Sequence, residues 1–95
     1  MEEKEKYLKI INNYGVIPQL KYFQSEVFEL NEAIITQELD ESGFGCGVEH
    51  IAEEIADCLV MIRQFKEYYG ISDNDIKNIM DYKVDRQIER IRNEK

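Results

Sequence analysis

Two pairs of acidic residues lie one helical turn apart, each beside a run of apolar residues. Glu26 and Glu29 occur in the segment EVFE, and Glu54 and Asp57 occur in the segment EIAD. Residues three positions apart on a helix share one face, so both carboxylates of a pair point to the same side. Mg²⁺ prefers oxygen ligands, keeps several waters and commonly shares its coordination shell with phosphates. Four converging carboxylates would therefore suit a magnesium site that also binds a phosphate chain.

The number of such pairs is not itself informative. With 20 acidic residues among 95, chance alone produces about as many pairs at this spacing as the sequence contains. What distinguishes these two pairs is their position on the flank of an apolar stripe, where an unpaired charge costs free energy. The alternative interpretation is a solvated helix flank that holds no ligand.

Apolar residues at helical spacing predict the two helices that carry these acids. At about 100° per residue, Glu26 and Glu54 lie about 60° from the centres of their stripes, and Glu29 and Asp57 lie roughly twice as far to the same side. If the two helices pack antiparallel, the four carboxylates can meet. The stripes consist of Leu20, Phe23, Val27, Leu30 and Ile34 in one helix and of Ile51, Ile55, Cys58, Ile62 and Phe65 in the other.

The whole chain reads as one all-α domain over residues 1–95, with no segment that resembles a strand. Gly15 separates the first two helices, and Gly70 is a plausible residue to end the third. Ser72 or Asp73 is a suitable N-cap for the fourth. We therefore expect a four-helix, bundle-like fold. The expected helices span about residues 3–13, 18–39, 48–69 and 73–93.

The last helix carries a second group of residues that could take part in binding or catalysis. Lys83, Arg86 and Arg90 follow one edge of its apolar stripe. Basic side chains in this arrangement can neutralise a triphosphate, although lysines and arginines also frame apolar faces without binding anything. Phe23 is an aromatic residue that could stack on a nucleobase, or it belongs to the helix core. His50 is the only histidine, and a lone histidine is more often structural than catalytic.

Charge and hydropathy exclude several classes of function. The net charge is −8, and it is uneven: residues 77–95 carry six basic and four acidic side chains, whereas the remaining residues carry six basic and 16 acidic ones. A general nucleic-acid-binding protein needs a basic face, so we expect no nucleic-acid partner. No apolar run approaches the roughly 18 residues of a membrane span, and the first residues are too charged for a signal peptide. We therefore expect no membrane partner and a cytoplasmic location.

The acidic motifs resemble those of a known family. EVFE is followed after 24 residues by EIAD, which is similar to the Glu-x-x-Glu and Glu-x-x-Asp signature of the MazG-like all-α nucleoside triphosphate pyrophosphohydrolases. The segments QLKYFQSEVFELNEAI and HIAEEIADCLVMI resemble the two motif helices of this family, and YKVDRQIERI resembles its basic last helix. The resemblance covers roughly residues 17–92.

This resemblance implies an activity and a set of roles. Members are small helical proteins that cleave a nucleoside triphosphate to the monophosphate and pyrophosphate. By resemblance, Mg²⁺, or Mn²⁺ in its place, would be held by the four acids, and Glu29 and Glu54 would be the catalytic carboxylates, with Glu29 orienting or deprotonating the attacking water. The expected metal ligands are Glu26, Glu29, Glu54 and Asp57, and the expected substrate-binding residues are Lys83, Arg86, Arg90 and Phe23.

The family resemblance also implies assembly, because members form dimers or tetramers. A short chain buries a thin core, and apolar residues outside the main stripes, such as Phe28, Ile35, Leu59 and Val60, need a partner surface. We therefore expect a homodimer or homotetramer. Three alternatives stay open: a deoxyuridine triphosphatase or phosphoribosyl-ATP pyrophosphohydrolase of the same superfamily, a non-enzymatic acidic protein that mimics nucleic acid, and a purely structural helical module.

Overall fold

The computed structural model describes residues 1–94, and these form four α-helices with no strand. This confirms the expectation of an all-α chain with four helices, and each observed helix end lies within two residues of the expected one. Ser72 caps the last helix, because its side-chain oxygen accepts a hydrogen bond of 3.0 Å from the backbone N–H of Asp75. The helices are α1 (Glu3–Tyr14), α2 (Val16–Leu39), α3 (Val48–Tyr68) and α4 (Asp73–Asn93).

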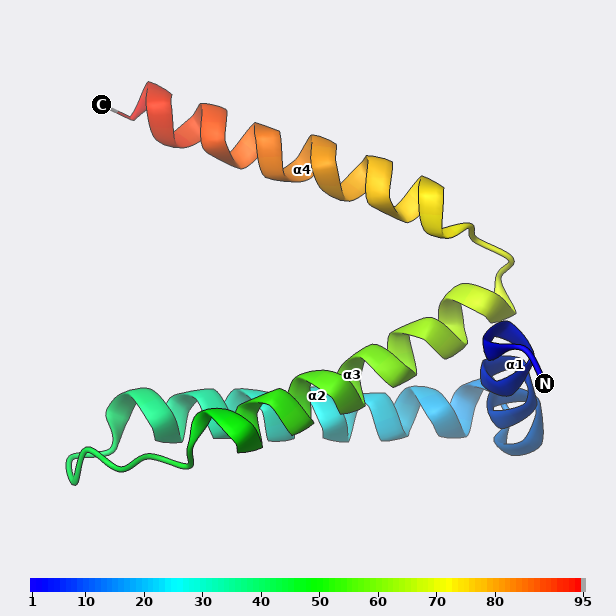
Figure 1. Ribbon diagram of the computed structural model, residues 1–95, viewed down its shortest axis with the longest axis horizontal. Helices are drawn as coiled ribbons and strands as arrows, with labels where there is room; N and C mark the ends of the chain where they lie inside the picture. Colours follow the sequence, from blue (N-terminus) through cyan, green and yellow to red (C-terminus); the bar gives the residue numbers. More distant parts are fainter. Residues whose placement is uncertain (95) are drawn as a thin grey trace.

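The helices α2 and α3 run antiparallel and pack along their length, while α1 crosses one end of the pair (Figure 1). Gly15 permits the sharp turn from α1 to α2 because its φ is +97°, a conformation that few other residues adopt without strain. Ile11 of α1 is fully buried at this end. At the other end, the loop after α2 is fastened to it, since the backbone N–H of Gly47 donates to the side chain of Gln37 at 2.9 Å.

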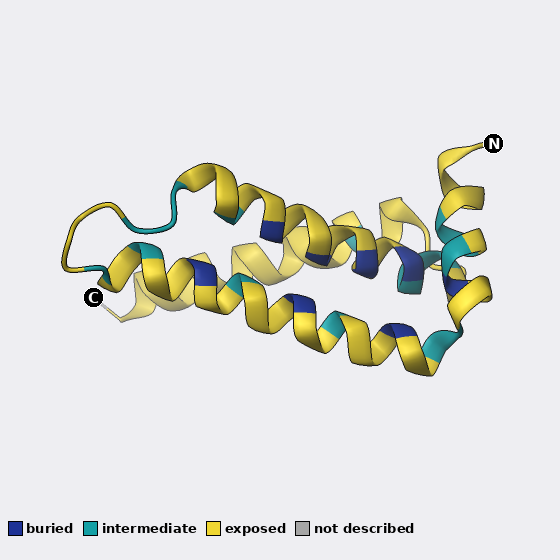
Figure 2. Cartoon of the chain, turned by 90° about the horizontal axis from the view of Figure 1, so that it is seen from below, coloured by how far each residue is buried: buried dark blue, intermediate teal, exposed yellow. Residues whose placement is uncertain are grey.

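The buried residues of α2 and α3 face each other in a single line along each helix (Figure 2). The sequence stripes predicted the centres of these faces incorrectly. Leu20, Val27 and Ile34 of α2 are exposed, as are Ile55 and Ile62 of α3. Each apolar stripe is wider than one neighbouring helix can cover, so one side of the stripe stays exposed. The acidic flank on its other side faces the neighbouring helix. The buried positions are Gln19, Glu26 and Ala33 on α2 and Glu54, Cys58, Met61 and Gln64 on α3.

Helix α4 stands apart from the other three (Figure 1). It does not pack on α1, α2 or α3, and all of its residues are exposed except Ile76, which is half-buried. Its first turn is tied to α3 by an ion pair of 3.0 Å between Lys66 Nζ and the Asp73 carboxylate. No helix among residues 1–94 combines the length and apolarity needed to cross a membrane.

Candidate metal centre

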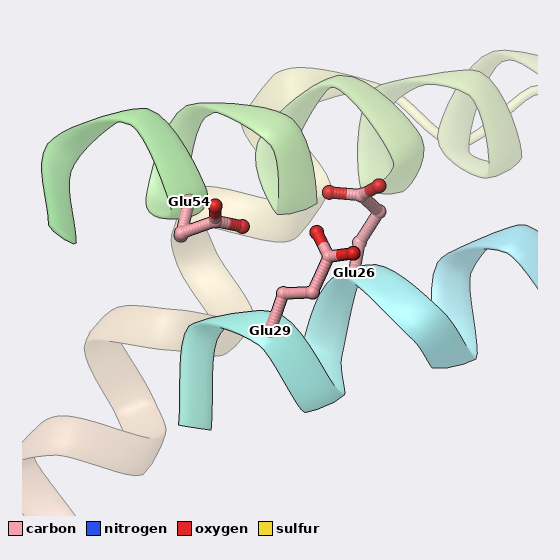
Figure 3. A group of neighbouring side chains, drawn as sticks. All are labelled: Glu26, Glu29 and Glu54. Atoms are coloured by element: carbon pink, nitrogen blue, oxygen red, sulfur yellow. The ribbon is translucent and has the colours of Figure 1, made fainter. Parts of the chain in front are cut away.

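Three carboxylates meet between α2 and α3. Glu26 and Glu29 come from adjacent turns of α2, and Glu54 reaches towards them from α3 (Figure 3). One oxygen from each side chain lies within 4.8 Å of an oxygen of the others. The antiparallel packing of the two helices places the acid pairs opposite each other, because each pair lies on the flank turned towards its neighbour. This is the convergence that the acid spacing predicted, for three of the four residues.

Two of these carboxylates are buried, and one oxygen of each lacks a hydrogen-bonding partner. Glu26 is 5% exposed and Glu54 is 8% exposed. The Oε2 atoms of both are buried and accept no hydrogen bond from the described residues. An unsatisfied buried polar atom costs free energy, and a buried charge without a counter-charge costs more. The site is therefore built at the expense of fold stability unless something positive occupies it.

The surroundings make both buried carboxyl groups weaker acids. Burial raises the pKa of Glu26, and the charges of Glu29, Asp57 and Glu54 raise it further, while the Tyr22 hydroxyl lowers it. Burial likewise raises the pKa of Glu54, with an added contribution from Glu29. These shifts share one physical cause, which is the crowding of negative charge where water is scarce.

His50 is the one basic group described close to the cluster. Its Nε2 lies 3.8 Å from Glu54 Oε1, and its Nδ1 lies 4.0 Å from Glu53 Oε2. The attraction of this imidazole lowers the pKa of Glu54 and so opposes the effect of burial. The side chain of His50 is 48% exposed, so solvent screens its interaction with Glu54. A single imidazole does not balance three carboxylates.

The donor set fits a hard divalent cation. All three groups offer carboxylate oxygens, which Mg²⁺ and Mn²⁺ prefer over nitrogen or sulfur ligands. The buried, unpartnered oxygens of Glu26 and Glu54 are available as ligand atoms. Glu29 is exposed, so the cluster stays open to solvent on one side. An open position of this kind leaves room for water and for a phosphate oxygen beside a bound metal.

Asp57 is set apart from the other three acids. It is exposed, and its oxygens are not within the 4.8 Å group. It lines a cavity of about 550 Å³ that Glu26 also lines. Its charge nevertheless contributes to the raised pKa values of Glu26 and Glu54. Asp57 thus lies at the edge of the cluster, where water can separate it from an ion.

The expected substrate-binding residues do not reach the carboxylates within one chain. Lys83, Arg86 and Arg90 line a shallow depression on α4 together with Val84 and Gln87. Helix α4 passes behind the α2 and α3 pair when the cluster is viewed as in Figure 3. Because α4 does not pack on the other helices, its basic side chains are not brought to the carboxylates.

Phe23 lies between α2 and α3. Its ring packs edge-to-face on that of Phe65, with centroids 5.7 Å apart. It lines neither of the two cavities that adjoin the carboxylates. Its position in this structure is that of a core aromatic residue.

Two cavities flank the cluster. We name the first the amide cavity: it measures about 550 Å³ and is lined by Tyr14, Gln19, Tyr22, Glu26, Asp57 and Gln64, among others. We name the second the histidine cavity: it measures about 470 Å³ and is lined by Phe28, Glu29, Glu32, Cys46, His50 and Glu54, among others. Glu26 belongs to the first, and Glu29 and Glu54 to the second. The carboxylate cluster is therefore the boundary between the two spaces.

The two buried glutamines, Gln19 and Gln64, were not predicted from the sequence. Gln19 donates through Nε2 to Gln64 Oε1 at 2.8 Å, across the interface between α2 and α3. A signal for them did exist. Gln19 precedes Glu26 by seven residues and Gln64 follows Asp57 by seven, and this spacing puts each glutamine on the face of its acid. His50, four residues before Glu54, was detectable by the same reasoning.

No model of a known protein family matches this chain, and no match is found among curated proteins or among solved structures.

Proposed function

We propose that this protein is a Mg²⁺-dependent nucleoside triphosphate pyrophosphohydrolase of the MazG-like all-α kind. It would cleave a ribo- or deoxyribonucleoside triphosphate to the monophosphate and pyrophosphate. The observation that carries the proposal is the group formed by Glu26, Glu29 and Glu54, in which two buried oxygens lack any partner. A site that costs stability in the empty protein is most simply explained by a ligand that restores it.

The three carboxylates differ in solvent exposure, and their proposed roles differ accordingly. When bound, Mg²⁺ supplies polarisation of a phosphate group and compensates the crowded negative charge. Glu26 and Glu54 are buried and would be the fixed ligands, and Asp57 at the edge would act through water. Glu29 is the exposed member, so it can both touch the metal and accept a proton from water. Glu54 would complete the cluster from α3, and His50 Nε2 lies 3.8 Å from its carboxylate.

The proposed reaction needs only the nucleoside triphosphate and water as reactants. The oxygen of water bonds to the α phosphorus while the bond from this phosphorus to the bridging oxygen of the β phosphate breaks. Pyrophosphate leaves with the bonding electrons, and the proton lost by water passes to Glu29. Basic side chains that approach the departing pyrophosphate would stabilise its growing charge.

These basic side chains would come from a second copy of the chain. Lys83, Arg86 and Arg90 belong to α4, which makes no packing contact in its own chain. Residues 77–95 carry six basic and four acidic side chains in a protein with net charge −8, so this segment is attracted to the acidic body of a partner. Exchange of α4 between two copies would place its basic edge near the partner's carboxylates.

Apolar surface supports the same assembly. Six exposed apolar residues occupy the flank of α2 and α3 opposite to that of Glu29, as judged from about 100° per residue. The apolar stripe of α4 is exposed as well. A monomer rarely leaves so much contiguous apolar surface in water, and we therefore expect a homodimer or homotetramer. The six residues are Leu20, Val27 and Ile34 of α2 and Ile55, Leu59 and Ile62 of α3.

The test is an incubation of the purified protein with a panel of nucleoside triphosphates, followed by identification of the products. We expect the monophosphate and pyrophosphate in the presence of Mg²⁺ or Mn²⁺, and no turnover in EDTA. Release of orthophosphate with a diphosphate would contradict attack at the α phosphorus. Full activity in EDTA would contradict the metal centre, and no turnover of any nucleotide would leave an acidic interaction protein as the better interpretation.

A further inference from the structure

The amide cavity contains chemistry that phosphate binding does not use. Part of its lining is apolar, with Ile10, Pro18, Val60 and Met61. Another part is acidic, with Glu26 and Asp57. A phosphate chain would be repelled from such a wall where no cation intervenes. The space is therefore suited to the uncharged end of a nucleotide.

Two buried amides face this cavity. Gln64 is 1% exposed and Gln19 is 8% exposed, and the hydrogen bond of 2.8 Å between them fixes their relative orientation. Each primary amide has two N–H donors and one carbonyl acceptor. Gln64 Nε2 finds only the sulfur of Met61, at 3.6 Å, and a thioether is a weak acceptor. Buried polar groups are normally hydrogen-bonded, so this pair is incompletely satisfied.

The geometry of the pair leaves one side chain free to read a ligand. Gln19 uses a single N–H to reach Gln64. No other hydrogen bond is made by the Gln19 amide among the described residues, and an amide that presents an N–H beside its carbonyl oxygen can engage a ligand that offers one acceptor next to one donor. The lactam edge of uracil, thymine or guanine has this pattern, and so does the amidine edge of cytosine or adenine. An ionised phosphate, which offers acceptors alone, does not.

We propose that the amide cavity is the nucleobase pocket, in which Gln19 reads the donor–acceptor edge of the base and Gln64 is a positioning residue that holds Gln19 in place. This inference rests on the proposed function, because it takes the phosphates to bind at the carboxylate cluster. Glu26 lines the cavity and belongs to the cluster, so one nucleotide can span both. The rings of Tyr14 and Tyr22 line the same cavity and offer apolar faces to a flat heterocycle.

The first experiment needs no metal and no turnover. Side-chain NH₂ signals of Gln19 and Gln64 are followed by NMR in the full-length ¹⁵N-labelled protein in EDTA, while each of the four ribonucleosides is added. We expect at least one nucleoside to shift both signals, and ribose to shift neither. If no nucleoside moves these signals, or if ribose moves them equally, the pocket is not a base pocket.

A matched pair of ligands tests the edge that is read. For the nucleoside that binds most tightly, one derivative carries a methyl group on the ring nitrogen of the donor–acceptor edge, and another carries it on a ring carbon outside that edge; for uridine these are N3 and C5. We expect the first methyl group to weaken binding at least about tenfold, the effect of one lost hydrogen bond, and the second to change it little. Equal effects would overturn the role of Gln19.

Variants separate the pocket from the chemistry. With Mg²⁺ and the preferred triphosphate, Gln19→Leu and Gln64→Met should raise KM at least about tenfold and leave kcat within a few-fold. Gln24→Leu, an exposed glutamine on the same helix, is the control and should leave both unchanged. Loss of kcat in Gln19→Leu with KM unchanged would contradict a binding role. Turnover without nucleoside shifts would refute the pocket alone, whereas shifts without turnover would refute the hydrolase alone.

Discussion

Glu53 and Glu54 are neighbours with opposite environments. The side chain of Glu53 is 76% exposed and that of Glu54 is 11% exposed. One residue of a helix turns the side chain by about 100°, which is enough to move a carboxylate from solvent to the α2 and α3 interface. Their chemistry is identical and their contribution to net charge is equal. The pair therefore separates an effect of position from an effect of charge.

The first prediction uses this pair. Glu54→Gln removes a candidate ligand and should lower Mg²⁺-dependent turnover at least about a hundredfold. Glu53→Gln should remain within a few-fold of the parent, because its carboxylate points to solvent. Steady-state rates at saturating nucleotide measure both. Equal, small losses at the two positions would remove the geometric basis for the metal centre.

The second prediction concerns pH in the absence of metal. Burial raises the pKa of Glu26 and of Glu54 above the ordinary value of 4.5. A carboxyl group with a raised pKa holds its proton more tightly in the folded chain than in the unfolded chain. The fold therefore loses stability as pH rises from 4.5 through the raised pKa values. Thermal unfolding in EDTA should show the Tm falling across this interval.

The same pair of variants isolates this effect from general repulsion in an acidic protein. Glu54→Gln removes one buried titrating group, so its Tm should fall less with rising pH, and above the interval it should equal or exceed that of the parent. Glu53→Gln should follow the parent curve. Saturating Mg²⁺ should flatten the parent curve, because a bound cation favours the ionised carboxylates. Parallel curves for all three proteins would show that the buried charge carries no penalty.

At the scale of elements, α4 differs from the rest of the chain in where its stability comes from. Helices α2 and α3 bury residues against each other along their length. Helix α4 buries none. Its local supports are the Ser72 cap and exposed ion pairs such as Lys77 with Asp81 at 2.7 Å. Exposed pairs of this kind contribute little, and most of the stability of a helix in a protein comes from the packing of its apolar face.

The third prediction follows from that difference. If α4 is an assembly element, its amide protection should depend on protein concentration. Between dilute and concentrated samples, hydrogen exchange in α4 should slow by at least about tenfold, as the packed form becomes populated. Amides in the middle of α3 serve as the internal reference and should change less. Protection of α4 that does not depend on concentration would contradict its docking on a partner.

At the scale of the whole molecule, the two halves of the proposed site lie on different elements that one chain does not bring together. The carboxylates lie between α2 and α3, and the basic residues lie on the detached α4. Apolar residues are exposed both on the α2 and α3 pair and on α4. Assembly through an exchanged α4 would complete the charge balance and bury the apolar surface in one step.

The fourth prediction is complementation between two inactive variants. One copy carries Glu54→Gln, and the other carries Arg86→Ala together with Arg90→Ala. In a mixed dimer, the intact carboxylates of the second copy meet the intact α4 of the first. Refolding an equal mixture should restore about a quarter of the parent activity, since half of the dimers are mixed and each has one complete site. Light scattering at micromolar concentration should show at least a dimer.

The control is a mixture of the arginine variant with a copy that carries all three substitutions. This mixture forms dimers equally well but contains no intact α4, so no activity should return. If mixed dimers form and the first mixture stays inactive, α4 does not act across the interface. A monomer by light scattering would reject the assembly itself.

The sequence by itself determined the four helices and their ends. Helix formation depends on residues within a turn or two of each other, so apolar spacing, Gly15 and Ser72 were sufficient to locate them. The acid pairs were equally local, because a spacing of three fixes a shared helix face. The sequence thus predicted that Glu26, Glu29, Glu54 and Asp57 lie on facing flanks, and the structure brings the first three together. Assembly and hydrolysis stay predictions.

Only the tertiary structure decided how far each helix turns about its own axis. The apolar stripes of α2 and α3 are wide, and many rotations bury a similar area. The observed rotation turns Glu26 and Glu54 inward and leaves Leu20, Val27 and Ile55 in solvent. It also sets Asp57 outside the tight group and joins Gln19 to Gln64 across 45 residues of sequence. The detachment of α4 was equally hidden, because an amphipathic pattern shows that a helix has an apolar face but not which surface covers it.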